Sequence, residues 1–184
     1  MRRLYLAAVL RAIGFAGPMI YLGAFYENEH GLSLQQIGFA LTASGIGIFL
    51  GNLAAGGRWL SRWRLETVYV ATTAALGCGW FLIYTLQVPA LAVVCIVAMT
   101  TFIGGLSFTS HTALLANATT GGAATTMTFL TAIIGFGIAL GVAVSGALLS
   151  LGGYAALGAA MPSFPLLAAL VVWRAPQTPT APST

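Results

Sequence analysis

Long apolar segments fill most of this chain of 184 residues and limit what it can fold into. Six of them reach the length of roughly 20 residues that an apolar helix needs to cross the hydrocarbon core of a membrane. The expected spans cover residues 4–26, 34–57, 66–86, 90–114, 125–149 and 154–173. We therefore predict an all-α integral membrane protein, with one six-helix bundle over residues 1–174.

Composition and the two ends of the chain agree with this prediction. Hydrophobic residues make up 59% of the chain and charged residues only 5%, which lies outside the usual range of soluble domains. The first apolar run is too long for the core of a signal peptide, so we expect a retained helix. Residues 175–184 are rich in proline and threonine and are expected to form a disordered cytoplasmic tail.

The basic residues predict the orientation. All seven are arginines, at positions 2, 3, 11, 58, 62, 64 and 174. With six spans they all fall on one side of the membrane, and basic loops stay in the cytoplasm. Both termini are therefore expected to be cytoplasmic, in a bacterial plasma membrane, with Glu27 and Glu29 outside. The net charge of +4 thus reflects topology, and no nucleic acid partner is expected.

A glycine-rich pattern occurs twice. Residues 45–56 read GIGIFLGNLAAG, and residues 135–146, ninety positions later, read GFGIALGVAVSG. Because each half would hold three spans, the second copy would be inverted relative to the first. An inverted 3+3 repeat is typical of transporters.

The repeat places small residues at a spacing of four. They are Gly47 and Gly51 in the first copy and Gly137, Gly141 and Ser145 in the second. Such stripes let helix backbones approach closely. Plain helix packing and a role in gating are both compatible with this spacing.

Two further patterns resemble signatures of the major facilitator superfamily. Its loop signature G-x-L-a-D-R-x-G-R-R is matched by Gly57 and Arg62, whereas Ser61 stands at the acidic position. Its antiporter signature g-x-x-x-G-P-x-x-G-G is matched in residues 137–146 at three glycines, with valine in place of proline. The resemblance covers about residues 4–174 and implies one half of a twelve-helix transporter, most similar to the C-terminal half of a bacterial drug-efflux carrier.

The resemblance also implies a partner and a mechanism. A second six-helix unit would be needed, so the chain would be a fragment, a split-gene partner or a homodimer. Together the units would move a small organic molecule by alternating access, and the family likeness implies that the direction is efflux. The alternative is a non-transporting assembly partner or a truncated remnant.

Several polar residues inside the spans are candidates for the cavity wall. Arg11 either snorkels to the cytoplasmic interface or attracts anionic groups at the mouth of a cavity. Thr100, Ser107 and His111 share one face of the 90–114 span with Gly104, which is expected to turn into protein, either to line a path or to pack. In the resembled fold Arg11, Asn52 and His111 would converge.

Tyr21 lies toward the external end of the first span. An aromatic belt at the membrane interface and an aromatic wall for an apolar substrate are both open for it. No carboxylate lies in the middle of a span, so His111 is the one titratable candidate for proton coupling unless another half supplies a carboxylate. Neither a catalytic motif nor a metal or cofactor site is expected, and the protein is not expected to be an enzyme.

Overall fold

In the computed structural model, residues 1–57, 62–86, 88–119 and 122–174 are described, and every regular element in them is a helix. The helices are α1 (Arg2–His30), α2 (Leu34–Ala55), α3 (Leu65–Thr85), α4 (Ala90–Ala118), α5 (Ala123–Ala160) and α6 (Ser163–Trp173). The predicted all-α membrane fold is confirmed. The predicted disorder of residues 175–184 lies outside the described residues.

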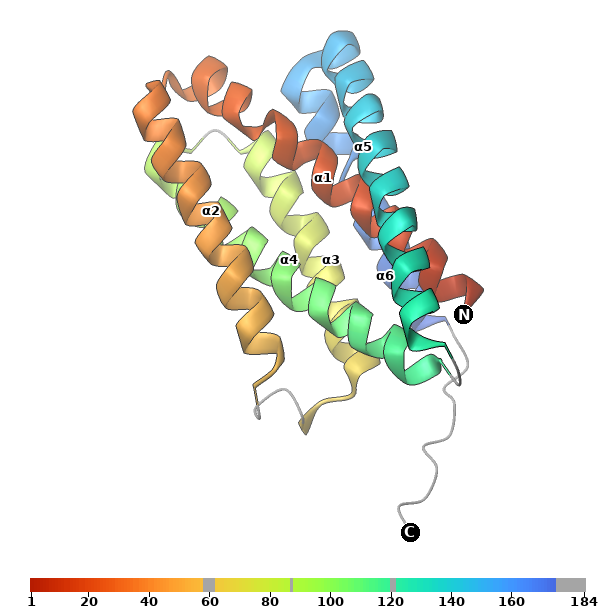
Figure 1. Ribbon diagram of the computed structural model, residues 1–184. Helices are drawn as coiled ribbons and strands as arrows, with labels where there is room; N and C mark the ends of the chain where they lie inside the picture. The colour runs from red at the N-terminus through yellow and green to blue at the C-terminus, as the bar shows by residue number, and fades with distance from the viewer. Residues whose placement is uncertain (58–61, 87, 120–121, 175–184) are drawn as a thin grey trace.

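Five helical stretches of the described chain are long and apolar enough to cross a membrane. The last of them, residues 124–173, is interrupted at Gly152 and Gly153, where the backbone is not helical. Gly153 has a φ of 63°, a conformation that glycine adopts without steric cost. Figure 1 shows the chain turning back on itself there. The predicted span 154–173 is thus divided between the end of α5 and α6, and the six-span count and the inverted repeat stay predictions.

Local sequence explains where α1 stops and α2 starts. The helix α1 runs four residues past the predicted end, because Glu27–His30 are compatible with a helix and the first breaker is Gly31. Gly31 has a φ of 62°, and its N–H donates to the Glu27 carbonyl at 3.0 Å. The next helix opens with a capping box in which Ser33 and Gln36 each bond the other's backbone N–H.

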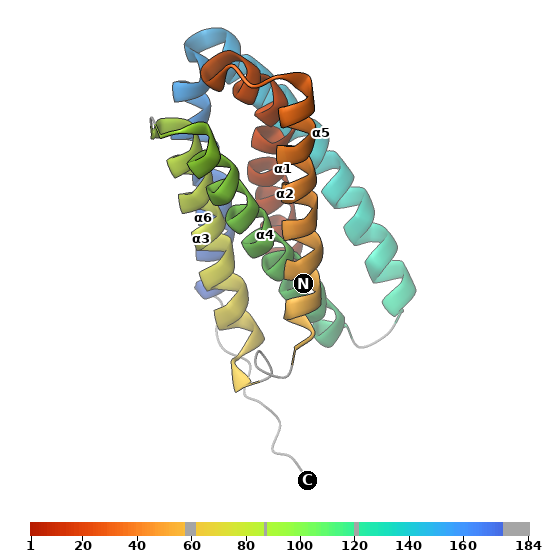
Figure 2. The same cartoon turned by 90° about the vertical axis from the view of Figure 1, so that its left-hand side faces the viewer.

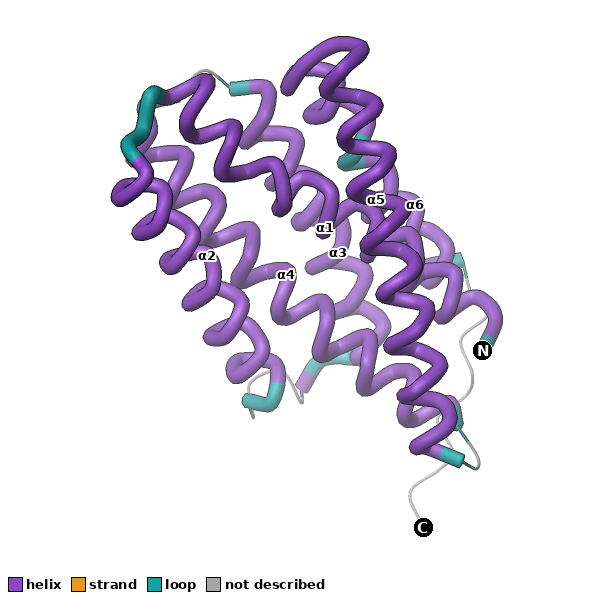
Figure 3. The backbone as a smooth tube through the Cα atoms, turned by 45° about the horizontal axis from the view of Figure 1, so that its top comes forward, coloured by secondary structure: helices purple, strands orange, loops and turns teal. Residues whose placement is uncertain are grey.

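The helices pair across the two halves of the chain. The most extensive contacts are those of α2 with α4 and of α1 with α5, and α3 packs against α4 and α6. Figure 2 shows α3 and α6 together on one side of the bundle and α5 on the other. Short connections join the helices, as the tube in Figure 3 shows. Consequently α2 and α5 lie at the edge of the bundle, where α2 packs mainly against α4 and α5 packs mainly against α1.

The connections alternate between two ends of the bundle. In Figure 1 the α1–α2 and α3–α4 connections lie at the top, and the α2–α3 and α4–α5 connections lie at the bottom. Glu27 and Glu29 therefore lie near the end opposite to Arg62 and Arg64. This is the separation of charges that the sequence predicts. The side of the membrane that each end faces stays a prediction.

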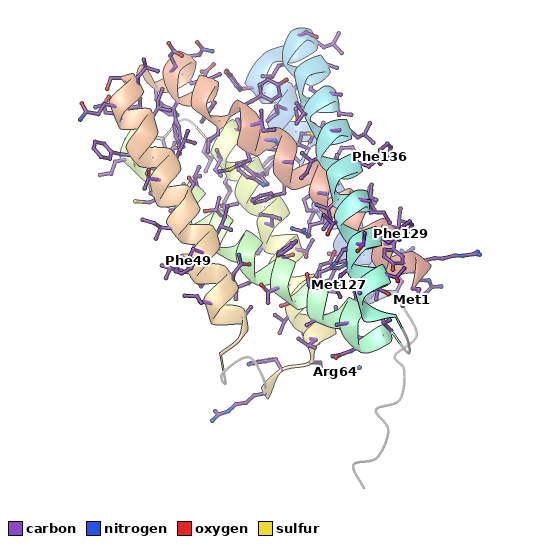
Figure 4. All side chains as sticks on the ribbon, viewed as in Figure 1. Met1, Phe49, Arg64, Met127, Phe129 and Phe136 are labelled. Carbon is purple, nitrogen blue, oxygen red and sulfur yellow. The ribbon has the colours of Figure 1, made fainter. Side chains whose placement is uncertain are left out.

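The interior is closed by aromatic side chains toward the top of the bundle. Trp80 and Tyr26 are fully buried, and Phe25 meets Tyr84 and Tyr154 edge to face at 4.7 and 5.1 Å between ring centroids. By contrast, large apolar side chains cover the outer faces of α2 and α5. In Figure 4, Phe49 points away from the bundle on α2, and Phe136 does so on α5. Such faces suit lipid or another apolar partner and would be a liability in water.

Candidate functional site

A cavity of about 440 Å³ lies between α1, α2, α4 and α5. None of its described lining residues comes from α3 or α6. The lining consists of Arg11, Ala12, Phe15, Ala16, Met19, Ile20, Ile48, Asn52, Gly104, Gly105, Phe108, Ile134 and Ile138. Ile20 and Ile138 are 56% and 39% exposed, so the cavity reaches the surface of this unit. Its volume lies in the range of sites for small organic molecules.

Arg11 is the one charged side chain among the described lining residues of the cavity. The side chain is only 4% exposed. Its Nε is buried without a hydrogen-bond partner, and the described part of the chain gives the guanidinium no ion pair. The guanidinium carbon lies 5.2 Å from the centroid of the Phe108 ring, a cation–π contact that offsets part of the cost of burial. A buried cation without an anion is rare and marks a functional site by default.

Asn52 faces Arg11's cavity from α2. Its side-chain oxygen accepts a hydrogen bond from the Thr109 hydroxyl of α4 at 3.0 Å. This bond orients the amide and leaves its N–H groups for other acceptors. The position is possible because α2 and α4 nearly touch there: a Cβ on Gly105 would come within 2.9 Å of the backbone nitrogen of Asn52. The polar part of the wall therefore consists of hydrogen-bond donors.

The other described lining residues are apolar, and none of them carries a carboxylate. Phe15 and Phe108 add aromatic surface, and isoleucines of α2 and α5 close the sides. The chain has three acidic residues. Glu27 and Glu29 are exposed near the far end of α1, and Glu66 pairs with Arg64 at 3.2 Å. The cavity is therefore mainly apolar, with one region of its wall that is positively charged and rich in hydrogen-bond donors.

Four residues predicted for the cavity wall lie elsewhere. Ser107 exchanges a hydrogen bond of 2.6 Å with Thr73 of α3, and Thr100 packs against Gly79 of the same helix. His111 lies 3.0 Å from the Leu4 carbonyl through Nε2 and stacks obliquely on Tyr69. The polar face of α4 thus turns into protein, mainly toward α3.

Tyr21 is the fourth of these residues. It is half-buried on α1, and a Cβ on Gly146 would come within 2.8 Å of its hydroxyl. Its ring therefore leans on α5 beyond the cavity. The structure brings together Arg11 and Asn52 and leaves Tyr21, Thr100, Ser107 and His111 outside the lining.

The glycines of the repeat lie where helices meet. A Cβ on Gly47 would come within 2.5 Å of the Ala98 carbonyl oxygen, and one on Gly51 would overlap the Phe102 carbonyl. On α5, a Cβ on Gly137 would come within 2.8 Å of the Ala12 side chain, and one on Gly141 within 2.5 Å of the Ile13 carbonyl oxygen. Every larger residue at these positions would push the helices apart.

Ser145 continues the stripe of α5. It is fully buried, and its hydroxyl has no hydrogen-bond partner. The hydroxyl lies against Gly17, where a Cβ would collide with it. Ser145 is therefore a spacer at the α1–α5 contact in this structure.

The predicted loop signature is described only at its edges. Gly57 follows the end of α2, and Arg62 is exposed before α3. Residues 58–61, which carry the middle of the signature, lie outside the described residues. Across the described chain, no three His, Cys, Asp or Glu side chains gather as a metal site.

Sequence reasoning missed the aromatic part of the cavity wall. Phe15 lies one helical turn after Arg11 on the same face of α1, and Phe108 lies one turn after Gly104 on the same face of α4. That spacing was the available signal. Phenylalanine is frequent in membrane helices, however, so the spacing alone did not separate them from the other aromatic residues.

Comparison with known proteins gives the family. No curated protein and no solved structure matches the chain. The family model described as Major Facilitator Superfamily matches residues 4–184. Since the match spans nearly the whole sequence and the fold is a bundle of membrane-length helices, this chain belongs to the Major Facilitator Superfamily of membrane transporters.

Proposed function

We propose that this chain is one half of a carrier that moves a small organic molecule across a membrane by alternating access. The single observation that carries the proposal is the cavity of about 440 Å³ between α1, α2, α4 and α5, which opens at the surface of the unit. A lateral opening of this kind needs a second wall. A second six-helix unit would supply it, as a second copy, a partner chain or a further part of the same polypeptide.

The outer surfaces of α2 and α5 favour this assembly. Both helices border the cavity, and both expose large apolar side chains, among them Phe49 and Phe136. Their glycine contacts allow small displacements against α4 and α1, because few interlocking side chains separate the backbones. Gly47, Gly51, Gly137 and Gly141 would thereby serve gating as well as packing.

Direction and location form part of the proposal. The glycine signature of α5 supports efflux, since it resembles the signature of antiporters. The arginines near one end of the bundle support cytoplasmic termini in a bacterial plasma membrane. The loop residues Gly57 and Arg62 would then face the cytoplasm.

Reconstitution in lipid vesicles tests the proposal. The chain would be inserted alone and together with a co-purified second unit, and uptake of radiolabelled lipophilic anions, neutral compounds and cations would be measured. Transport of any probe by a twelve-helix assembly would support a carrier. A stable monomer that moves no probe, with no second unit co-purifying, would instead support a remnant or assembly partner.

A further inference from the structure

We infer that the cavity beside Arg11 binds the anionic group of an amphipathic organic molecule, such as a carboxylate or sulfonate. The inference rests on the proposed function, because it names the substrate class of the same cavity. It depends on three features of the wall: an unpaired cation, a set of donors without matching acceptors, and an apolar body around them.

The unpaired cation is the first feature. The Arg11 side chain is only 4% exposed, and its Nε has no hydrogen-bond partner. The Phe108 ring covers one side of the guanidinium at 5.2 Å. A carboxylate in the cavity would add a charge-assisted, two-pronged hydrogen bond that the protein leaves unmade. A cation in the same place would meet repulsion without any carboxylate to offset it.

The Asn52 amide is the second feature. Because its oxygen is engaged by Thr109 at 3.0 Å, the amide presents its N–H side to new partners. Arg11 and Asn52 are the only charged or amide side chains among the described lining residues. Both offer donors, so the site matches a ligand group rich in acceptors.

The apolar wall is the third feature. Phe15 and Met19 lie one and two helical turns after Arg11 on α1, Phe108 lies on α4, and Ile134 and Ile138 line the cavity from α5. This surface suits an aromatic or aliphatic body attached to the anionic group. A fully hydrated inorganic anion would leave that surface unused.

An anion could also come from an acidic side chain of the second unit. A second copy of this chain has no carboxylate in the middle of a span, since Glu27, Glu29 and Glu66 lie at helix ends. A different second unit would have to supply it. Binding of a free organic anion, to the chain alone and to the assembly, separates the two sources.

The test measures binding of radiolabelled 1-naphthoate to the full chain in phosphatidylcholine nanodiscs, with empty nanodiscs subtracted. The neutral 1-naphthamide and the cationic 1-naphthylmethylammonium serve as matched probes. We expect Arg11→Gln to weaken naphthoate binding about tenfold to a hundredfold, as for the loss of a charged hydrogen bond. Naphthamide binding should change by less than about twofold, because only the charged interaction is lost.

Two further variants keep the test decisive. Arg11→Lys retains the charge and should retain most naphthoate binding. Arg3→Gln removes the same charge at an exposed site on the same helix and should leave binding unchanged. If Arg11→Gln does not insert stably, Asn52→Leu gives the second reading, with an expected loss of about threefold to tenfold for one neutral hydrogen bond.

Three results would overturn the inference. They are equal affinity of the unaltered chain for naphthoate and naphthamide, equal losses in Arg11→Gln and Arg3→Gln, and disappearance of naphthoate binding once a second unit is bound. Naphthoate binding without transport of any probe would refute the carrier and leave the anion site standing. Transport of neutral or cationic probes in preference to anions would support the carrier and refute the anion site.

Discussion

Two helix contacts, α2 with α4 and α1 with α5, use the same glycine pattern in different ways. At the first contact glycines lie on both helices: Gly47 and Gly51 meet the backbone of α4, and a Cβ on Gly105 would come within 2.5 Å of the Ile48 carbonyl oxygen. Backbone therefore lies directly on backbone. An added methyl group has no side chain that could rotate away from it.

At the second contact glycines also lie on both helices, because a Cβ on Gly17 of α1 would come within 2.6 Å of the Gly141 carbonyl oxygen of α5, but side chains lie between the helices as well. Gly137 lies over Ala12 and Val9, and Gly141 lies over Ile13. The spacer Ser145 follows one turn later against Gly17. Part of this contact is thus made by side chains, which have more freedom to adjust than a helix backbone.

Both contacts border the same cavity. Asn52 follows Gly51 along α2, and Arg11 precedes Ala12 along α1. A shift at either contact would therefore move one polar residue of the wall. An inverted repeat predicts this correspondence, since it pairs Gly47 and Gly51 with Gly137 and Gly141. The repeat itself stays a prediction.

The largest effect is expected at the α2–α4 contact. Gly51→Ala should lower the free energy of unfolding by about 1–3 kcal/mol, the usual cost of overpacking, because the new methyl group would overlap the Phe102 carbonyl. Titration with a denaturing detergent, followed by circular dichroism, measures this change in mixed micelles.

Gly45→Ala is the control for that measurement. It adds the same methyl group to the same helix, where no atom lies within 4 Å. Its unfolding free energy should stay equal or rise by up to about 1 kcal/mol, since alanine favours the helix. Equal destabilisation by both substitutions would refute the backbone contact.

A smaller loss is expected from Gly141→Ala at the α1–α5 contact, with Gly135→Ala as the exposed control. The methyl group would come within 2.5 Å of the Ile13 carbonyl oxygen, a smaller overlap than that of Gly51 with the Phe102 carbonyl, and we expect a loss of about 1 kcal/mol, near the lower end of the overpacking range. The two contacts lie on different helix pairs, so the double variant Gly51→Ala/Gly141→Ala should show additive losses. Greater loss in Gly141→Ala than in Gly51→Ala would reverse the comparison.

The sequence was informative about the fold because the bilayer imposes length and polarity on each span. Gly31 and Gly152 lie between predicted spans, and at both the backbone leaves the helical conformation. The break before α6 was not predicted. Pro162 stands at the N-cap of α6, and proline in an apolar run is compatible with a kink as well as with a helix start.

The site was less predictable, because the spacing of residues shows which of them share one face of a helix but not which other helix that face contacts. Thr100, Ser107 and His111 do share one face of α4, yet tertiary packing turns that face toward α3. Arg11 and Asn52 share the cavity because α1 and α2 pass on the same side of α4. Hydropathy carries no information on which helices are neighbours.

The smallest effect is expected from the hydroxyl at the α1–α5 contact. Ser145 and Ser44 are both fully buried, but only Ser44 has a partner, the Ala40 carbonyl at 2.9 Å. Removing an unpaired buried hydroxyl relieves its desolvation cost, so Ser145→Ala should raise the unfolding free energy by up to about 1 kcal/mol. Ser44→Ala should lower it by up to about 1 kcal/mol, because a made hydrogen bond is lost. The same detergent titration measures both, and a loss in Ser145→Ala would mean that its hydroxyl stabilises the contact through a partner on α1.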